Sequence, residues 1–383
     1  MSTVLQPAPA GVKSKASPQP APRNTAIDAY RGMVMLLMMA EVLELSRVSR
    51  AFPGNPFWAF LAWNQTHVAW AGCSLHDTIQ PGFSFLVGVA LPYSIAARLA
   101  RGESFGRMLV HAIRRSLILI ALGIFLRSIG RPMTYFTFED TLTQIGLGYT
   151  FLFLLGFASQ RIRWSALGAI LAGYWLAWML YPAPHWSIGH NLGVAFDRWF
   201  LNLFPRTAPF VNNSGGYCTL SFIPTLGTMI LGLLAGNWLR SANPTIPFRR
   251  LLAAGGIGIA AGVLLHFTGV CPIVKRIWTP AWTLFSGGLC FLYLSAFCWL
   301  TEVRRWRRPL FPLLVIGMNS IAAYVIAETL RGFVYSSFRI HLGPHFFAFL
   351  GTGLEPLFRG CATLAVYWLV LFWMYRRKIF LRI

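Results

Sequence analysis

The chain has 383 residues, of which 56% are hydrophobic and 11% charged, and its mean hydropathy is +0.57. A soluble domain cannot bury so much apolar surface, so the composition excludes a soluble globular protein. A net charge of +22 suggests nucleic acid in a soluble protein, but here the Lys and Arg residues fall in short clusters between apolar runs. Membrane topology and anionic lipid account for such clusters, so we expect a lipid bilayer as partner and no nucleic acid.

Residues 1–24 are rich in Pro, Ala, Ser and Lys and lack the apolar core of a signal peptide. We predict a disordered cytoplasmic tail there. The remainder, 25–383, is predicted to be one transmembrane domain. An open sheet is excluded because lipid cannot satisfy the polar groups of its edges.

Apolar runs of roughly 20 residues are long enough to cross a hydrocarbon core as helices. The predicted fold is therefore all-α, a polytopic membrane helix bundle of about ten transmembrane helices. The expected spans are 27–46, 78–97, 112–128, 141–158, 164–181, 221–239, 251–267, 280–300, 311–330 and 359–376.

The orientation follows from the positive charges. With the N-terminus inside, 22 of the 33 Lys and Arg residues fall on the cytoplasmic side and 11 on the outer side. Both termini are then cytoplasmic, and the longer loops, 47–77, 182–220 and 331–358, lie outside. These loops are rich in aromatic residues, which an interfacial belt explains as well as a sugar ligand does.

Ionisable residues within the spans gather in the first quarter of the chain. Asp28 and Arg31 lie three residues apart on one helical face, which suits a self-neutralising structural pair as well as a functional one. Further along, Asp77, Gln80 and Ser84 form a polar stripe that enters the membrane at helical spacing.

His67 precedes this stripe in an outer loop. A single loop histidine is more often inert than catalytic. A carboxylate such as Asp77 would orient the imidazole and raise its basicity, which is the usual support for a general base or nucleophilic nitrogen. Late in the chain, Asn319, Ser320 and Tyr324 form a second polar group in an apolar run, and such groups either bind a ligand or hold helices together.

Five motifs together resemble the heparan-α-glucosaminide N-acetyltransferase family, which are polytopic acetyltransferases with many bacterial relatives. The motifs are IDAYRG at 27–32, HVAWAG at 67–72 followed by Asp77 and Pro81, TQIGLGY at 143–149, KRIWT at 275–279 and GMNSIAAY at 317–324. They follow the family's order over nearly the whole chain beyond the tail.

The resemblance implies transfer of an acetyl group from cytosolic acetyl-CoA, across the membrane, to an amino or hydroxyl group of a sugar or glycan. His67 matches the family's active histidine, which acts as acetyl acceptor or general base, and Asp77 matches a nearby acidic residue. No metal is expected. We assign acetyl-CoA binding to Arg31, Gln80, Ser84, Asn319, Ser320 and Tyr324, and substrate binding to Trp70, His76, Lys275 and Trp278.

The chain departs from the family near the outer end of the first span. The family commonly has an Asn there, where this chain reads MMAEVLEL with Glu41. The family's large lumenal N-terminal domain is absent as well, which argues against heparan sulfate and for a bacterial inner-membrane enzyme that modifies an envelope glycan.

The alternative function is a transporter or flippase for a glycan or lipid-linked sugar, with the same polar residues lining a path. No inverted repeat or pair of interrupted helices is evident, which disfavours it. The sequence leaves open the acceptor, N- against O-acylation, the acyl chain length, an acetyl-histidine intermediate against direct transfer, and the oligomeric state, including a homodimer.

Overall fold

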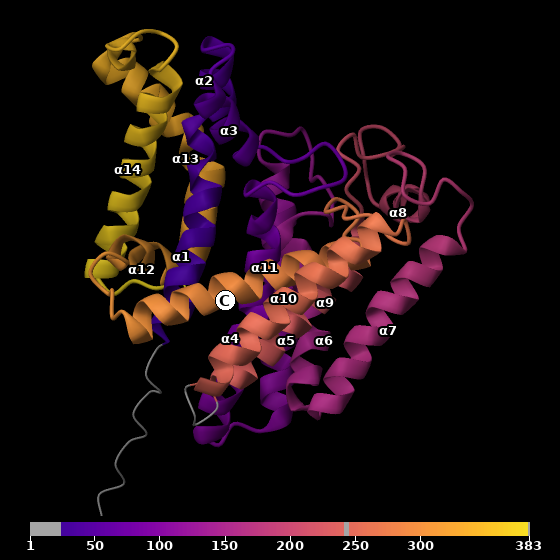
Figure 1. The fold of residues 1–383 in the computed structure, drawn as a ribbon. Helices are drawn as coiled ribbons and strands as arrows, with labels where there is room; N and C mark the ends of the chain where they lie inside the picture. The colour runs from indigo at the N-terminus through magenta and orange to yellow at the C-terminus, as the bar shows by residue number, and fades with distance from the viewer. Residues whose placement is uncertain (1–23, 241–244, 382–383) are drawn as a thin grey trace, which may run out of the picture.

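The computed structural model describes residues 24–240 and 245–381, so the predicted tail lies outside the described residues except for Asn24. The regular elements of the described part are all helices (Figure 1). The α-helices are α1 (Thr25–Met39), α2 (Leu45–Ala51), α3 (Pro56–Asn64), α4 (Ile79–Ala100), α5 (Phe105–Ser128), α6 (Thr141–Phe157), α7 (Gln160–Met179), α8 (Leu192–Phe200), α9 (Phe222–Leu239), α10 (Thr245–Phe267), α11 (Pro280–Cys298), α12 (Phe311–Gly317), α13 (Ser320–Leu342) and α14 (Glu355–Arg376).

The helices form two groups. Helices α4 to α11 make one bundle, in which α4 packs on α9, α5 on α6 and α10 on α11. Helix α1 lies beside α12, α13 and α14 in a second group (Figure 1). Contacts of α1 with α4 and α11 join the two.

The predicted helical membrane bundle is confirmed. Each expected span coincides with a helix or helix pair, and the described residues contain six helices that are long and apolar enough to cross a membrane. Helices α12 and α13 qualify as a seventh span if counted together. Helices α1 and α6 have only 15 and 17 residues. The number of about ten spans therefore stays a prediction.

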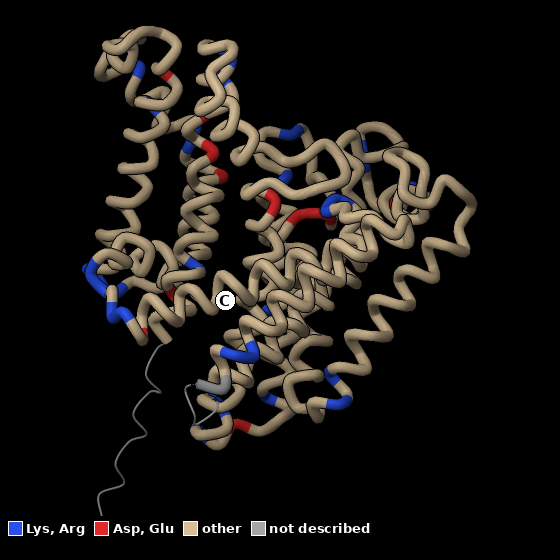
Figure 2. The backbone as a smooth tube through the Cα atoms, viewed as in Figure 1, with Lys and Arg blue, Asp and Glu red and all other residues tan. Residues whose placement is uncertain are grey.

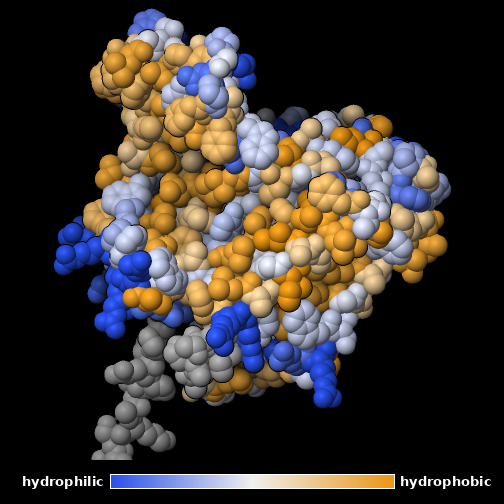
Figure 3. All heavy atoms as spheres, in the orientation of Figure 1, coloured by the Kyte–Doolittle hydropathy of each residue, from blue (hydrophilic) through white to orange (hydrophobic). Residues whose placement is uncertain are grey.

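Large apolar side chains on the outside of the bundle fit this interpretation. Ile257 on α10, Phe125 on α5 and Leu369 on α14 are between 57% and 70% exposed, and Figure 3 shows hydrophobic residues spread over the middle of the molecule. Without lipid, such a surface would be exposed to water. In Figure 2, Lys and Arg lie at both ends of the molecule, and many of them gather along its lower edge, called the basic rim below. Four arginines follow α11 in sequence, Arg304, Arg305, Arg307 and Arg308.

The expected span 311–330 is not one continuous helix. The structure breaks it at Met318 and Asn319, and α12 and α13 meet at 82°. Asn319 leaves the helical conformation. Its side-chain Nδ2 donates to the Ile379 carbonyl at 2.7 Å, and its side-chain Oδ1 accepts from the Leu381 N–H at 3.0 Å. The continuous apolar pattern gave no sign of this break.

The first span also ends earlier than expected. Glu44 has φ +49°, in the left-handed region, so the chain turns there before α2. Its carboxylate accepts from Arg47 at 2.8 Å and Arg359 at 3.0 Å, and it also pairs with Arg331. The end of the first span is thereby tied to α13 and α14.

Glycine allows α4 and α9 to cross closely. An added Cβ on Gly232 would lie 1.9 Å from the Phe85 carbonyl oxygen, and one on Gly88 would lie 2.0 Å from that of Met229. These distances are far below van der Waals contact with backbone atoms that a rotamer change cannot move. The crossing therefore depends on glycine in both helices.

We expect Gly232→Ala to lower the free energy of unfolding by about 1–3 kcal/mol, because the methyl group must push the two backbones apart. Gly168→Ala on α7 is the matched control, since an added Cβ there meets nothing within 4 Å. Thermal unfolding of the purified protein in detergent measures the difference. Equal melting temperatures for the two variants would contradict this account of the crossing.

Candidate active site

Two loops that are distant in sequence meet at one end of the larger bundle. One loop joins α3 to the 3₁₀ turn at His76–Thr78, and the other joins α10 to α11. Ala71 and Val274 form an antiparallel bridge, and Arg276 Nη2 donates to the Val68 carbonyl at 3.2 Å. Gly72 has φ +118°, a conformation that side chains rarely adopt, where its N–H donates to the second loop.

The second loop is tightly turned, and the turn directs Lys275 inward. The Trp278 N–H donates to the Lys275 carbonyl at 2.8 Å, and Trp278 itself has φ +48°. Thr279 caps α11, accepting from the Trp282 N–H at 3.2 Å and from the Val274 N–H at 3.1 Å. Lys275 is consequently 4% exposed although it lies in a connecting loop.

Asp77 is the common acceptor of the first loop. Its side chain is 1% exposed. Oδ2 accepts from the backbone N–H groups of Val68 at 3.2 Å and Ser74 at 3.0 Å. Oδ1 lies 2.8 Å from His67 Nδ1 and 3.4 Å from Lys275 Nζ. A buried carboxylate needs this number of donors, because burial without partners costs several kcal/mol.

His67 combines this buried anchor with access to solvent. Nδ1 faces Asp77, and the side chain is 36% exposed. Burial and the Lys275 charge lower the pKa of His67 below its ordinary 6.5, although the Asp77 carboxylate acts in the opposite direction. The ring is therefore neutral at pH 7. If Nδ1 donates to Asp77, Nε2 carries the lone pair of a base or nucleophile.

His76 and Glu41 extend the cluster toward α1. The rings of His67 and His76 are 4.6 Å apart between centroids, and His76 Nε2 lies 3.1 Å from Glu41 Oε1. The Glu41 side chain is 52% exposed. Glu41, at the position where the sequence departs from the family that it resembles, thus holds a carboxylate that contacts the cluster through a second imidazole.

The predicted site residues fall into two sets. His67, Asp77, His76 and Lys275 are brought together, and Trp70 stands at the edge of the same loop, where its Nε1 donates to the Trp186 carbonyl at 2.8 Å. Trp278 is 1% exposed and donates to Thr228, so in this conformation it contacts the core and not an external ligand.

The residues assigned to acetyl-CoA are not gathered in one place. Arg31 pairs with Asp28 at 3.2 Å on α1. Ser84 is fully buried, with its hydroxyl donating to the Gln80 carbonyl within α4. Asn319 holds residues 379–381, as described above, while Ser320 begins α13 and Tyr324 follows one turn later. These assignments stay proposals.

Ser74 belongs to the site, and the sequence interpretation missed it. Its N–H donates to Asp77 Oδ2, and its hydroxyl accepts from the Asp77 N–H at 3.4 Å. This reciprocal pair is a capping box, and the spacing Ser-x-x-Asp before an apolar run is its sequence signal. Motif reading could therefore have predicted that Ser74 fixes the Asp77 carboxylate.

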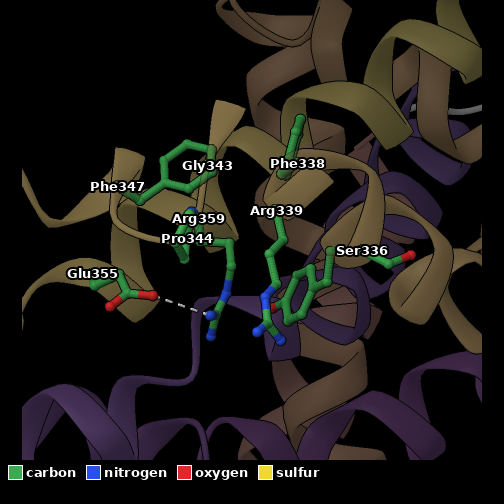
Figure 4. Close-up of a pocket in the computed structure, with 9 residues that line it drawn as sticks. Ser336, Phe338, Arg339, Gly343, Pro344, Phe347, Glu355 and Arg359 are labelled. Carbon is green, nitrogen blue, oxygen red and sulfur yellow. Dashed lines mark hydrogen bonds and ion pairs between the residues drawn. The ribbon is translucent and has the colours of Figure 1, made fainter. Parts of the chain in front are cut away.

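A separate cavity of about 320 Å³ lies at the same end of the molecule, between α13 and α14. Figure 4 shows Arg339, Arg359 and Glu355 at its wall together with Phe338 and Phe347. Its lining includes neither His67 nor Asp77, so we do not assign the candidate chemistry to it.

We expect Arg276→Met to loosen the loop that carries His67, because the Arg276 guanidinium donates to the carbonyls of Val68 and Gly215. Hydrogen–deuterium exchange should quicken in peptides covering 66–75. Arg198→Met is the control, since Arg198 donates to Val211 in another outer loop. Exchange that is unchanged in Arg276→Met would show that the loop holds its shape without this residue.

Comparison with known proteins finds no matching family model. The human heparan-alpha-glucosaminide N-acetyltransferase is 24% identical over 422 residues, and the mouse protein of the same name is 22% identical over 421 residues. Each alignment covers 94% of this chain, but the chain spans only 60% of the length of these relatives. The predicted resemblance is confirmed: over 94% of its length, this chain is similar to heparan-α-glucosaminide N-acetyltransferases.

Proposed function

We propose that this protein is a membrane acetyltransferase that moves an acetyl group from acetyl-CoA to an amino or hydroxyl group of a sugar or glycan. The observation that carries the proposal is a neutral, partly exposed imidazole, anchored through Nδ1 on a buried carboxylate, in a chain related to N-acetyltransferases. The names of the relatives favour an amino sugar as acceptor.

His67 supplies what acetyl transfer to an amine requires. An amine attacks only when its nitrogen has a free lone pair. In direct transfer, the acceptor nitrogen attacks the thioester carbonyl, the C–S bond breaks, and CoA leaves as a thiolate. The proton that the acceptor loses goes to His67 Nε2 and then to the thiolate.

A second route uses the same nitrogen as nucleophile. Nε2 attacks the thioester carbonyl, the C–S bond breaks, and CoA leaves as a thiolate, which gives an Nε2-acetyl-imidazolium. The acceptor nitrogen then takes the acetyl group, the C–Nε2 bond breaks, and the proton that the acceptor loses goes to the thiolate. Both routes need a neutral ring with its lone pair at Nε2. Trapping an acetylated His67 from acetyl-CoA without acceptor would support the second route.

The transfer is proposed to run across the membrane of a bacterial cell, with both termini cytoplasmic. The basic rim lies at the opposite end of α4 from His67, and 22 residues of helix span about 33 Å. Positive side chains at that rim would attract the phosphates of CoA. The thioester must then travel most of the length of α4 to reach the imidazole.

We expect His67→Ala to reduce acetyl transfer at least about 100-fold, because it removes the proposed base or nucleophile. The assay uses protein in liposomes with acetyl-CoA and glucosamine, and mass spectrometry of the product. His345→Ala, in the exposed connection before α14, is the control for loss of a histidine. Full activity of a folded His67→Ala protein would overturn the proposal. Movement of unmodified sugar without acetyl-CoA would favour transport instead.

We expect Asp77→Asn to lower kcat about 100-fold with little change in KM for the acceptor. Asp77 is 1% exposed, so it cannot contact the acceptor, but it fixes the ring that does the chemistry. Steady-state kinetics of the variant against wild type separate the two parameters. A raised KM with unchanged kcat would place Asp77 in substrate binding instead.

A further inference from the structure

Lys275 is a buried cation at the centre of the candidate site. Its side chain is 4% exposed, and Nζ lies 3.1 Å from His67 Nδ1 and 3.4 Å from Asp77 Oδ1. A group this enclosed cannot meet a sugar from outside. Its neighbours are the imidazole and the carboxylate, so any effect on the chemistry acts through them.

The hydrogen bonds around Nδ1 cannot all form at once. Nδ1 either donates its hydrogen to Asp77 or accepts one from Lys275. Oδ2 of Asp77 already accepts from the N–H groups of Val68 and Ser74, so His67 and Lys275 share Oδ1, which has two lone pairs and can accept from both. When the Lys275 ammonium donates to Oδ1, His67 Nδ1 keeps its hydrogen and donates it to the same oxygen. The free lone pair of the ring is then at Nε2.

We propose that Lys275 is a positioning residue that keeps the His67 imidazole neutral by holding a second positive charge at the carboxylate oxygen the two residues share. The inference rests on the proposed function for its catalytic consequence. The protonation state of His67 can be measured separately.

The charges around His67 agree with this role. Asp77 and Lys275 balance each other, so a protonated His67 would leave the buried trio with one uncompensated positive charge. The His76 ring lies beside the His67 ring, tilted by 45°, with Glu41 beyond it, and the Arg276 guanidinium is directed to backbone carbonyls. Burial lowers the pKa of Lys275 to about 8, with Asp77 opposing that shift, so the ammonium persists at neutral pH.

Diethyl pyrocarbonate reports on His67 without any assay of catalysis, because it modifies a histidine in its neutral form and not in its protonated form. The extent of modification of the His67 peptide is measured by mass spectrometry from about pH 5 to about pH 8. The wild-type midpoint should lie below 6.5, the ordinary pKa of histidine. In Lys275→Met, which removes the charge but keeps the chain length, the midpoint should rise by about one unit, a tenfold change in the ratio of neutral to charged ring. Lys275→Arg keeps the charge and should stay near wild type.

A midpoint that does not move in folded Lys275→Met would overturn the inference. If that variant does not fold, Lys275→Gln is measured in its place, and a midpoint that stays at the wild-type value would overturn the inference. Acetyl transfer is measured on the same preparations. A shifted midpoint in a protein without transferase activity would sustain the role of Lys275 and defeat the proposed function. An active enzyme with an unmoved midpoint would do the reverse.

Discussion

The buried carboxylate of Asp77 is the interaction on which the site depends. A charge with 1% exposure must be surrounded by donors, and those donors come from two loops about 200 residues apart in sequence. Val68, Ser74 and His67 belong to one loop, and Lys275 belongs to the other. The hydrogen bonds that satisfy the Asp77 carboxylate therefore also hold the two loops together and fix the His67 imidazole.

The position of the site follows from the two environments of the protein, which are lipid around the helices and water at their ends. Loops with polar backbone groups cannot lie in lipid, so they gather at the ends of the helices. There, a ring can be partly buried among loop residues and still reach water, as His67 does with 36% exposure. The two-bundle arrangement leaves α1 beside this end, and so Glu41 contacts the cluster through His76.

Much of this architecture can be read from the sequence. Apolar runs predict where helices lie, because the requirement for internal hydrogen bonding in lipid leaves few alternatives. The pairing of His67 with Asp77 was also predictable. The burial of Lys275 was not, since a lysine in an outer loop is ordinarily exposed, and only the turn at Trp278 directs it inward. The break at Asn319 was equally hidden, because it depends on a partner about 60 residues away.

That distant partner has a consequence for how the protein is made. Residues 379–381 follow α14, so the backbone groups that satisfy the Asn319 amide are synthesised about 60 residues after it. Until then the amide needs water or a temporary partner. The corner between α12 and α13 is thus completed only after α14 has been synthesised and the residues that follow it reach the start of α13.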